Sequence, residues 1–345
     1  MTTPALGIVV PTLNRRESVL RLLHALESQT ASDFEVVVVV DGSTDGTAEA
    51  VDAYRAPYEL RRVSLQRSGL AAARNAGARA TSAPIVQFLD DDMEPSPGMV
   101  AAHLARQRRG DALGVVGAAP IVVPAGASPI VRYRARGFGR KLDRLAGRRD
   151  ALEFNDVYGG NVSFGRETLL AAGGYDETFR VYGHEDYELS LRLTRAGHRF
   201  AYEPDALAQQ YYDKTLRELA ADVESEGRTA VAFARKHPDV LSALQLGGLH
   251  KRSMSVRARL CLLAWLDSLT GGIGERLLAN VERTELATPA SSDAERFARY
   301  DTLFDILYWL GAERALRTPA TPWWDAAIRR VDRWLGEEAA STATD

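Results

Sequence analysis

The chain has 345 residues, which is enough for one large α/β domain with an appendage or for two domains. Hydrophobic residues make up 46% and charged residues 26%, the proportions of an ordinary soluble globular protein. The net charge of -3 argues against a general nucleic-acid binder, so no nucleic-acid partner is expected. The single cysteine, Cys261, excludes an internal disulfide framework and a cysteine-based zinc site, and its apolar sequence neighbours predict a buried structural thiol.

The N-terminus and the apolar runs bear on where the protein resides. Residues 1–4 lack the charged start and the long apolar region of a signal peptide. No segment approaches the ~18 consecutive apolar residues of a membrane span. We therefore expect a cytoplasmic protein and leave open a peripheral contact with the inner face of the membrane.

Strand-like and helix-like segments alternate in the first half of the chain. Residues 6–10 and 34–40 predict buried strands, because their apolar and β-branched side chains leave neither face for water. Helical spacing follows at residues 17–28, and a further helix is expected from about Ala48. This alternation predicts an α/β fold with a mostly parallel central sheet flanked by helices. The glycine pattern of dinucleotide-binding proteins is absent after the first strand, which counts against that class, and the absence of the P-loop pattern excludes P-loop proteins.

Residues 85–89 predict another buried strand, which ends in Asp90, Asp91 and Asp92. Three adjacent carboxylates repel one another, so they persist most readily where a cation compensates them. Oxygen ligands of this kind favour Mg²⁺ or Mn²⁺, although a solvated acidic loop is the alternative. Because ligands of open α/β sheets bind at the carboxyl ends of the strands, we expect residues 11–15, 41–45 and 90–92 to converge on one crevice.

Three later segments carry further candidates. Residues 69–77 predict a helix of small residues, in which Arg74 faces a phosphate or forms a surface salt bridge. Residues 159–165 predict a flexible approach to a short strand. A helix that ends at Gly197 carries Glu185 and Asp186 in its first turn, where such a pair most often compensates the helix dipole.

Taken together and in order, these segments resemble the inverting glycosyltransferases of family 2, which have a GT-A fold. The matching segments are VVPTLNR at 9–15, VDGSTDGT at 40–47, RNAG at 74–77, FLDDD at 88–92, GGN at 159–161 and ED at 185–186. Each is weak alone, whereas the ordered set is specific and spans residues 6–237. We therefore expect a GT-A domain at 1–237, a helical C-terminal region at 238–336 and a disordered tail at 337–345.

The resemblance implies a donor site for a nucleotide-diphospho-sugar. Asp41 would read the base, most often uracil, by accepting its imide proton. The base and ribose pocket would be lined by Pro11, Thr12 and Arg15. Further donor contacts would come from Arg74, Asp90, Asp91, Gly160 and Asn161.

The resemblance also implies a divalent cation, Mg²⁺ or Mn²⁺, on the donor diphosphate. Asp92 would hold it together with Asp90. Family members often add a histidine ligand after the Glu-Asp helix, and here Gln210 occupies that place, with Asp213 as a substitute. A glutamine carbonyl is a weaker ligand than imidazole for Mn²⁺, so the metal preference stays open.

For catalysis, the resemblance implies Asp186 as the general base and Glu185 as its support. A sugar hydroxyl is a poor nucleophile, and a positioned carboxylate can remove its proton as the new bond forms. Direct displacement at the anomeric carbon would invert its configuration and give a β-linked product from an α-linked donor.

Two features lie outside these motifs. Residues 131–149 hold eight basic side chains against Asp143, with glycines that suggest a mobile segment. This segment is either a solvated loop or a lid that attracts phosphate, an anionic acceptor or an acidic lipid surface. Residues 256–269, 297–310 and 323–335 predict amphipathic helices, which are more often core than binding site. A homodimer or an acceptor-binding wall built from them stays open, and a membrane-lying helix is less favoured because of acidic flanks.

The combined prediction is a metal-dependent, inverting glycosyltransferase with a UDP-sugar as the expected donor. One rival is a catalytically weak nucleotide-sugar-binding scaffold, suggested by the missing histidine. The other is a nucleotidyltransferase, whose Gly-rich signature near the first strand is absent. The acceptor, whether a glycan, a lipid-linked sugar, a peptide or a small metabolite, does not follow from the motifs.

Overall fold

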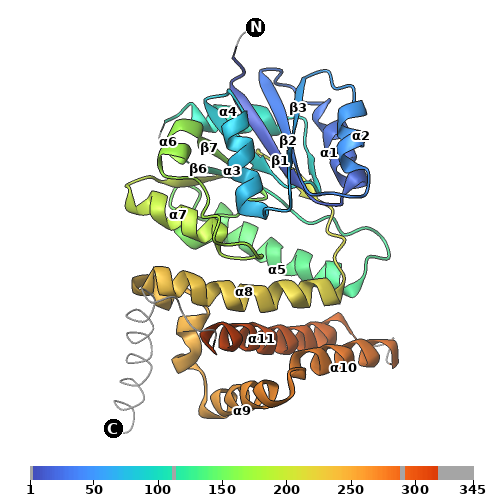
Figure 1. Cartoon of the computed structure of the whole chain (residues 1–345), viewed down its shortest axis with the longest axis vertical. Coiled ribbons are helices and arrows are strands. Elements are labelled where there is room, and N and C mark those ends of the chain that lie inside the picture. The colour runs from blue at the N-terminus through green and yellow to red at the C-terminus, as the bar shows by residue number, and fades with distance from the viewer. Residues whose placement is uncertain (1–2, 111–113, 288–291, 318–345) are drawn as a thin grey trace. The chain divides into compact units, whose positions relative to one another are not determined.

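The computed structural model describes residues 3–110, 114–287 and 292–317 (Figure 1). These described residues divide into two compact units. The first unit contains the chain up to Val181 together with Glu185–Lys214, and the second contains Tyr182–His184 and the described residues from Thr215 onward.

Within the described chain, the first unit is built on a seven-stranded sheet with the order β3-β2-β1-β4-β7-β6-β8. Its strands are β1 (Leu6–Thr12), β2 (Phe34–Asp41), β3 (Glu59–Leu65), β4 (Ile85–Leu89), β6 (Gly114–Gly117), β7 (Asn161–Gly165) and β8 (Phe200–Glu203). Strands β3, β2, β1 and β4 are parallel, β7 runs antiparallel to β4 and β6, and β8 is parallel to β6. Beside it, β5 (Met93–Pro95) and β9 (Ala208–Gln210) form an antiparallel pair.

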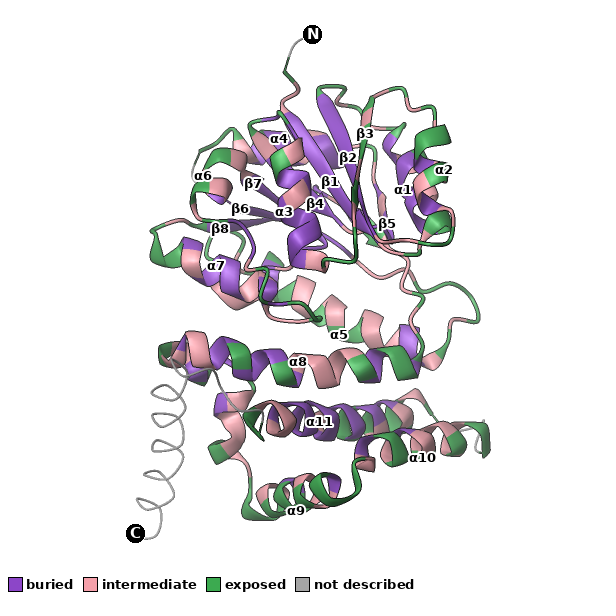
Figure 2. Ribbon diagram, viewed as in Figure 1, coloured by how far each residue is buried: buried purple, intermediate pink, exposed green. Residues whose placement is uncertain are grey.

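Helices cover both faces of this sheet. They are α1 (Arg16–Leu26), α2 (Thr47–Ala53), α3 (Leu70–Ala80), α4 (Met99–Gln107), α5 (Pro129–Ala146), the 3-10 helix η1 (Phe154–Asp156), α6 (Arg166–Ala171) and α7 (Glu185–Arg195). Alternate side chains of a strand point to opposite faces, so Val9 packs in the core with α3 while Ile8 packs in the core with α1. Every residue of β1 and β2 is buried (Figure 2). The predicted α/β fold with a mostly parallel sheet, buried on both faces, is confirmed.

The second unit is helical, as predicted. Its elements are α8 (Leu216–Lys236), η2 (Pro238–Ala243), η3 (Leu246–Lys251), α9 (Met254–Thr270), α10 (Ile273–Ala287) and α11 (Asp293–Arg317). Helices α8 and α11 approach closely through two glycines: a Cβ at Gly227 would overlap the backbone of Tyr308, and one at Gly311 would overlap the backbone of Glu224. This packing places α8 in the second unit, so the contacts divide the chain after Lys214, before the boundary at residue 237 that the sequence predicts.

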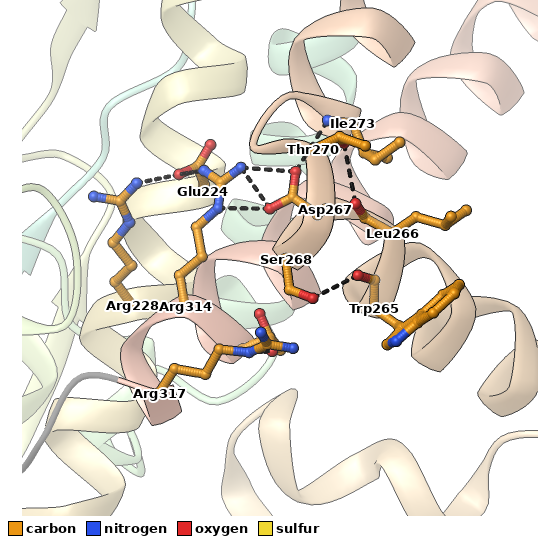
Figure 3. Close-up of polar contacts among 11 residues, drawn as sticks. Glu224, Arg228, Trp265, Leu266, Asp267, Ser268, Thr270, Ile273, Arg314 and Arg317 are labelled. Carbon is orange, nitrogen blue, oxygen red and sulfur yellow. Dashed lines mark hydrogen bonds and ion pairs between the residues drawn. The ribbon is translucent and has the colours of Figure 1, made fainter.

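A buried ion pair fastens α9 to α11 (Figure 3). Asp267, which is 4% exposed, accepts two hydrogen bonds from one edge of the Arg314 guanidinium, from Nε at 2.9 Å and from Nη2 at 3.0 Å. The same carboxylate accepts the backbone N–H of Ile273 at 3.0 Å, at the start of α10. Arg314 also donates to Glu224 of α8 at 2.6 Å. One guanidinium therefore connects α8, α9 and α11, and the carboxylate adds α10.

Three expectations change at this level. Cys261 is exposed rather than buried, because α9 packs through the face that carries Leu260 and Asp267. The opposite face of α9 is not core either, since Trp265 is 56% exposed. The basic segment is not a loop: most of it forms the helix α5.

The predicted helix at 323–335 and the tail at 337–345 lie outside the described residues. No helix in the described ranges combines the length and the apolar composition needed to cross a membrane.

Candidate functional site

The carboxyl ends of β1, β2 and β4 meet, as expected for parallel strands. At the end of β1, the Thr12 hydroxyl donates to Asp91 Oδ2 at 2.7 Å, and Arg15 Nε lies 3.2 Å from Asp91 Oδ1. The loop after β2 joins them, because Asp45 Oδ2 accepts the backbone N–H of Arg16 at 3.1 Å. Pro11 lies in β1, opposite Val39 of β2. The strand ends that were predicted to converge therefore lie together.

Asp41 holds the loop in front of α3. Its two carboxylate oxygens accept the backbone N–H groups of Ser68 at 2.6 Å and Gly69 at 2.8 Å. The side chain is 6% exposed and lies at the end of β2. Its role in reading a base stays a prediction, and the geometry adds a second task, since this carboxylate fixes the start of α3.

Asp91 and Asp92 form a buried acidic centre beside Arg15. Burial raises the pKa of Asp91 to about 7, against the opposing effects of Arg15 and of the hydrogen bond from Thr12. Burial, followed by the charge of Asp90, raises the pKa of Asp92 to about 6. The surroundings of both carboxyls therefore disfavour the ionised forms, because burial is not fully compensated by nearby positive charge.

Gln210 lies beside Asp92, where the sequence places it. Its side-chain amide donates to Asp92 Oδ2 at 3.1 Å, and the next residue, Tyr211, donates its backbone N–H to the Asp92 carbonyl at 2.9 Å. Asp213, the suggested substitute ligand, instead accepts two hydrogen bonds from Arg15, at 2.9 and 3.0 Å. Arg15 thus joins the β1 loop to the segment that follows β9.

Arg74 is the centre of a second, neighbouring cluster. It is 2% exposed, so the alternative of a surface salt bridge is wrong. Its guanidinium lies 3.0 Å from Asp186, 3.2 Å from Asp90 and 3.4 Å from Glu185. Burial by itself would lower the pKa of Arg74, but the charge of these carboxylates raises it well above its ordinary value. The guanidinium packs over the ring of Tyr175 at 5.1 Å.

The paired glycines before β7 make room for this cluster. A Cβ at Gly159 would overlap the guanidinium of Arg74, and one at Gly160 would lie 2.9 Å from Asp90 Oδ2. The backbone N–H of Gly159 donates to Asp186 Oδ2 at 2.8 Å. The sequence suggested a flexible approach to a strand here. The structure gives the two glycines a packing reason instead.

Glu185 and Asp186 begin α7. Asn75 fixes the turn at Tyr175, in the segment between α6 and α7. Asn75 Nδ2 donates to the backbone carbonyl of Tyr175 at 2.9 Å, and Asn75 Oδ1 accepts the backbone N–H of Tyr175 at 2.8 Å. His184 belongs to the second unit, and its Nδ1 lies 2.9 Å from the hydroxyl of Thr229.

Asn161 does not present its side chain to this cluster. Its amide donates to the carbonyls of Ala118 at 3.1 Å and Ala206 at 2.8 Å, and its carbonyl oxygen lies 2.9 Å from both Gln87 Nε2 and His103 Nε2. The side chain is fully buried. It therefore ties strands together, and only its backbone is left for a ligand.

Comparisons with known proteins agree with this geometry. Residues 7–169 match the model of the family described as Glycosyl transferase family 2, and residues 148–213 match one described as N-terminal domain of galactosyltransferase. The validoxylamine A glucosyltransferase of Streptomyces hygroscopicus subsp. jinggangensis (strain 5008) is 31% identical over 269 residues, which are 70% of this chain and 63% of that protein. The chain belongs to glycosyl transferase family 2.

Two further similarities concern the length of this family 2 chain and its fold. The pre-mycofactocin glycosyltransferase of Mycobacterium tuberculosis (strain CDC 1551 / Oshkosh) is 29% identical over 274 residues, 77% of this chain and 53% of that protein. The chain thus spans only 63% and 53% of the length of these two relatives. The solved mannosyltransferase PcManGT from Pyrobaculum calidifontis, in complex with GDP-Man and Mn²⁺, has a TM-score of 0.62 at 22% identity, covering 93% of this chain and 89% of that one. This likeness confirms the GT-A fold.

The candidate site contains an atom suited to a cation. Asp92 Oδ1 is buried and has no hydrogen-bond partner within the described part of the chain, although a buried carboxylate oxygen is normally paired. Among the described residues, no group of three or more His, Cys, Asp or Glu side chains could hold a metal by itself. One free carboxylate oxygen fits a cation of the Mg²⁺ type, which is commonly bound by one or two carboxylates and completed by substrate phosphates.

Sequence reasoning passed over several residues that build the family 2 site. Asn75 and Tyr175 have no chemistry of their own that would single them out. Their signal is only their place, beside Arg74 and in the turn before α7.

Proposed function

We propose that this chain is a glycosyltransferase that moves a sugar from a nucleotide-diphospho-sugar to an acceptor hydroxyl. One observation supports this best: a carboxylate, Asp186, stands at the start of α7 in contact with Arg74, whose guanidinium also reaches Asp90 at the end of β4. A candidate base and a candidate donor site are thereby joined through one buried side chain. The names of the relatives agree with this class of reaction, and no single relative assigns the sugar.

The donor would lie over the ends of β1, β2 and β4. Thr12, Arg15 and Asp41 would take the nucleotide, with Pro11 as part of the pocket wall. We propose a UDP-sugar as the donor class. PcManGT was solved with GDP-Man, so GDP-sugars are the first alternative.

A divalent cation, Mg²⁺ or Mn²⁺, would be held by Asp92, with Asp90 and Gln210 as further ligands. Gln210 would have to turn its carbonyl oxygen toward the cation, since its amide now donates to Asp92. When bound, such a cation stabilises the charge that develops on the departing nucleoside diphosphate. Arg15 would remain as the fixed positive charge beside Asp91.

Asp186 would accept the proton of the acceptor hydroxyl, and Glu185 would support it through their shared partner Arg74. The N–H of Gly159 and the guanidinium of Arg74 occupy one oxygen each of the Asp186 carboxylate, which fixes its orientation. A base held in this way promotes a single displacement with inversion at the anomeric carbon.

We also propose the cytoplasmic location that the sequence predicts.

The test is the release of nucleoside diphosphate from UDP-, GDP- and dTDP-sugars, measured with Mg²⁺, with Mn²⁺ and with EDTA. We expect metal-dependent release from one donor class, lost in Asp92→Ala and kept in the matched control Asp205→Ala, an exposed carboxylate. Release that persists in EDTA would contradict the metal dependence. If calorimetry detects no binding of any nucleotide sugar, the glycosyltransferase proposal fails.

A second candidate is a nucleotide-sugar-binding protein with little turnover. Gln210 favours it, because an amide stands where family members often place a histidine ligand. The same experiment separates the two, since this candidate predicts binding of a nucleotide sugar without release of nucleoside diphosphate, with or without acceptor.

A further inference from the structure

The inner face of α5 carries a lysine, Lys141, that pairs with no carboxylate among the residues that the structure describes. Lys141 lies one turn before the buried Leu145 on α5, and its ammonium sits 5.2 Å from the centre of the Tyr158 ring. Phe138, one turn earlier on α5, packs edge-on against the same ring at 5.2 Å. The stem and the charged end of Lys141 are therefore placed by aromatic packing rather than by an ion pair.

The carboxylates near Lys141 already form ion pairs with arginine side chains. Asp156 pairs with Arg148 at 2.9 Å and with Arg144 at 3.7 Å. Asp186 pairs with Arg74 at 3.0 Å. Within the described ranges, Lys141 makes no ion pair with a carboxylate. Burial consequently lowers the pKa of Lys141 to about 8, although Asp156 and Asp186 act in the opposite direction. A partly desolvated ammonium in this situation is stabilised by any anion that reaches it.

Lys141 lies next to the candidate base. The ring beneath its ammonium belongs to Tyr158, and the following residue, Gly159, donates its N–H to Asp186. The charges that act most on Lys141 are those of Asp156 and Asp186. Those that act most on Asp92, at the candidate metal, are Asp90 and Arg15. Within the candidate site, the carboxylate that acts most on Lys141 is therefore that of the candidate base, Asp186.

We propose that Lys141 binds an anionic group, a carboxylate or a phosphate, of the acceptor whose hydroxyl is presented to Asp186. This rests on the proposed function, because it takes Asp186 as the base. Arg134 and Arg144 lie seven positions before and three positions after Lys141, on the same side of α5, and add positive potential. The acceptor would then be an acidic or phosphorylated hydroxyl compound rather than a neutral sugar.

The experiment uses the full chain and three matched probes: glucose, glucuronate and glucose 6-phosphate. Each is titrated calorimetrically, with and without UDP and Mg²⁺, into wild type, Lys141→Met, Lys141→Arg and Arg140→Gln. Arg140 is exposed on α5 beside Lys141, so its removal changes the charge equally at a surface position. We expect an anionic probe to bind at least tenfold more tightly than glucose. This preference should disappear in Lys141→Met and persist in Lys141→Arg and Arg140→Gln.

The pattern of binding distinguishes the sources of the anion. Preference for glucuronate alone assigns a carboxylate, preference for glucose 6-phosphate alone assigns a phosphate, and preference for both assigns an anion site of either kind. The proposal is overturned if no anionic probe binds more tightly than glucose, if Lys141→Met keeps the preference, or if Lys141→Arg loses it as fully as Lys141→Met. It is also overturned if Lys141→Met weakens nucleotide-sugar binding instead. Failure of the proposed function would show separately, as an absence of nucleotide-sugar binding to wild type.

Discussion

At the scale of single residues, Arg74 decides the arrangement of the candidate site. It is almost fully buried and reaches carboxylates on β4's end and on α7. Removing one partner of a buried pair leaves an uncompensated charge, which typically costs about 3–5 kcal/mol. A substitution that displaces Arg74 would therefore act on both the donor side and the base side, whereas one that keeps its position can act on one side alone.

Asp186→Asn tests the base directly. The amide keeps the size of the side chain but cannot accept the acceptor proton, so transfer should fall at least about 10²-fold, the usual range for a lost general base. Nucleotide-sugar affinity should stay within about twofold. Both are measured by nucleoside diphosphate release and by calorimetry, with Asp205→Asn as an exposed control. Transfer at the wild-type rate would remove Asp186 from the mechanism.

Gly159→Ala tests the packing beneath Arg74. The new Cβ would overlap the guanidinium, so Arg74 must shift away from Asp186 or the protein must accept strain of about 1–3 kcal/mol. We expect a lower melting temperature together with a loss of transfer. Gly98→Ala is the matched control, because nothing lies within 4 Å of a Cβ there. If Gly159→Ala behaves like Gly98→Ala, the space around Arg74 is not limiting.

At the scale of elements, α4 is tied to β7 by a neutral histidine. His103 is fully buried, with Nε2 at 2.9 Å from Asn161 Oδ1 and Nδ1 at 2.9 Å from the Ser163 hydroxyl. Asn161 Oδ1 can only accept, so Nε2 carries the proton and Nδ1 accepts from Ser163. Burial lowers the pKa of His103 to about 4, against the hydrogen bond to Asn161.

This histidine predicts a pH dependence of stability. Between pH ~4 and the ordinary histidine pKa of about 6.5, the unfolded chain binds a proton that the folded chain excludes. The contribution of His103 is therefore complete above pH ~6.5 and is lost as the pH falls. Relative to wild type, His103→Gln should gain about 2 kcal/mol in free energy of unfolding between pH 7 and pH 5.

Urea unfolding at the two pH values measures this difference. Comparing variant with wild type cancels the other titrating groups, including Asp91 and Asp92. His24→Gln, an exposed histidine on α1, should follow wild type at both pH values. A constant gap between His103→Gln and wild type would show that the buried ring does not control the slope.

The elements that were predictable from the sequence are those whose pattern reflects burial on both sides. β1, β2 and β4 are continuous apolar runs for this reason. β3 went unpredicted because it is an edge strand whose residues are largely exposed, so polar side chains such as Arg61 and Arg62 interrupt the apolar pattern. α5 was read as a loop because of its charge and its glycines, yet it forms a helix whose inner face packs through Ile130, Val131 and Leu145.

Some residues of the candidate site were likewise predictable from the sequence, and others were not. The carboxylates after β4 and the Glu-Asp pair of α7 were found because strand ends and helix starts are readable in sequence. The direction of Asn161 was not, since the pleat of β7 decides whether a side chain faces the core or a ligand. The roles of Gly159 and Tyr158 depend on what lies across from them in space, and no local pattern contains that information.

At the scale of the whole molecule, the two units can be observed separately. All five tryptophans lie in the C-terminal part of the chain. Their positions are Trp265, Trp309, Trp323, Trp324 and Trp334. Tryptophan fluorescence therefore reports on the chain from residue 265 onward, whereas nucleotide-sugar binding reports on the first unit.

Arg314→Met uses this separation. The change leaves Asp267 buried without its ion-pair partner, while the methionine retains apolar contact with the neighbouring helices. Arg314 is about one-third exposed, so we expect a loss of about 2 kcal/mol, below the range for a fully buried pair. The fluorescence midpoint in urea should fall, and nucleotide-sugar affinity at low urea should not change. Arg317→Met is the control on the same helix, because its partner Glu313 lies one turn away in a more exposed pair worth about 0.5 kcal/mol at most.

A double variant decides whether uncompensated charge is the cause. Asn at position 267 can still accept the N–H of Ile273 through its carbonyl oxygen, so the link to α10 survives while the charge is removed. Asp267→Asn combined with Arg314→Met should therefore recover at least half of the stability that Arg314→Met loses. If the double variant is as unstable as the sum of the two single changes, the loss comes from packing around Arg314 and not from the buried carboxylate. If Arg314→Met unfolds at the same midpoint as Arg317→Met, the network of Figure 3 does not hold the second unit together.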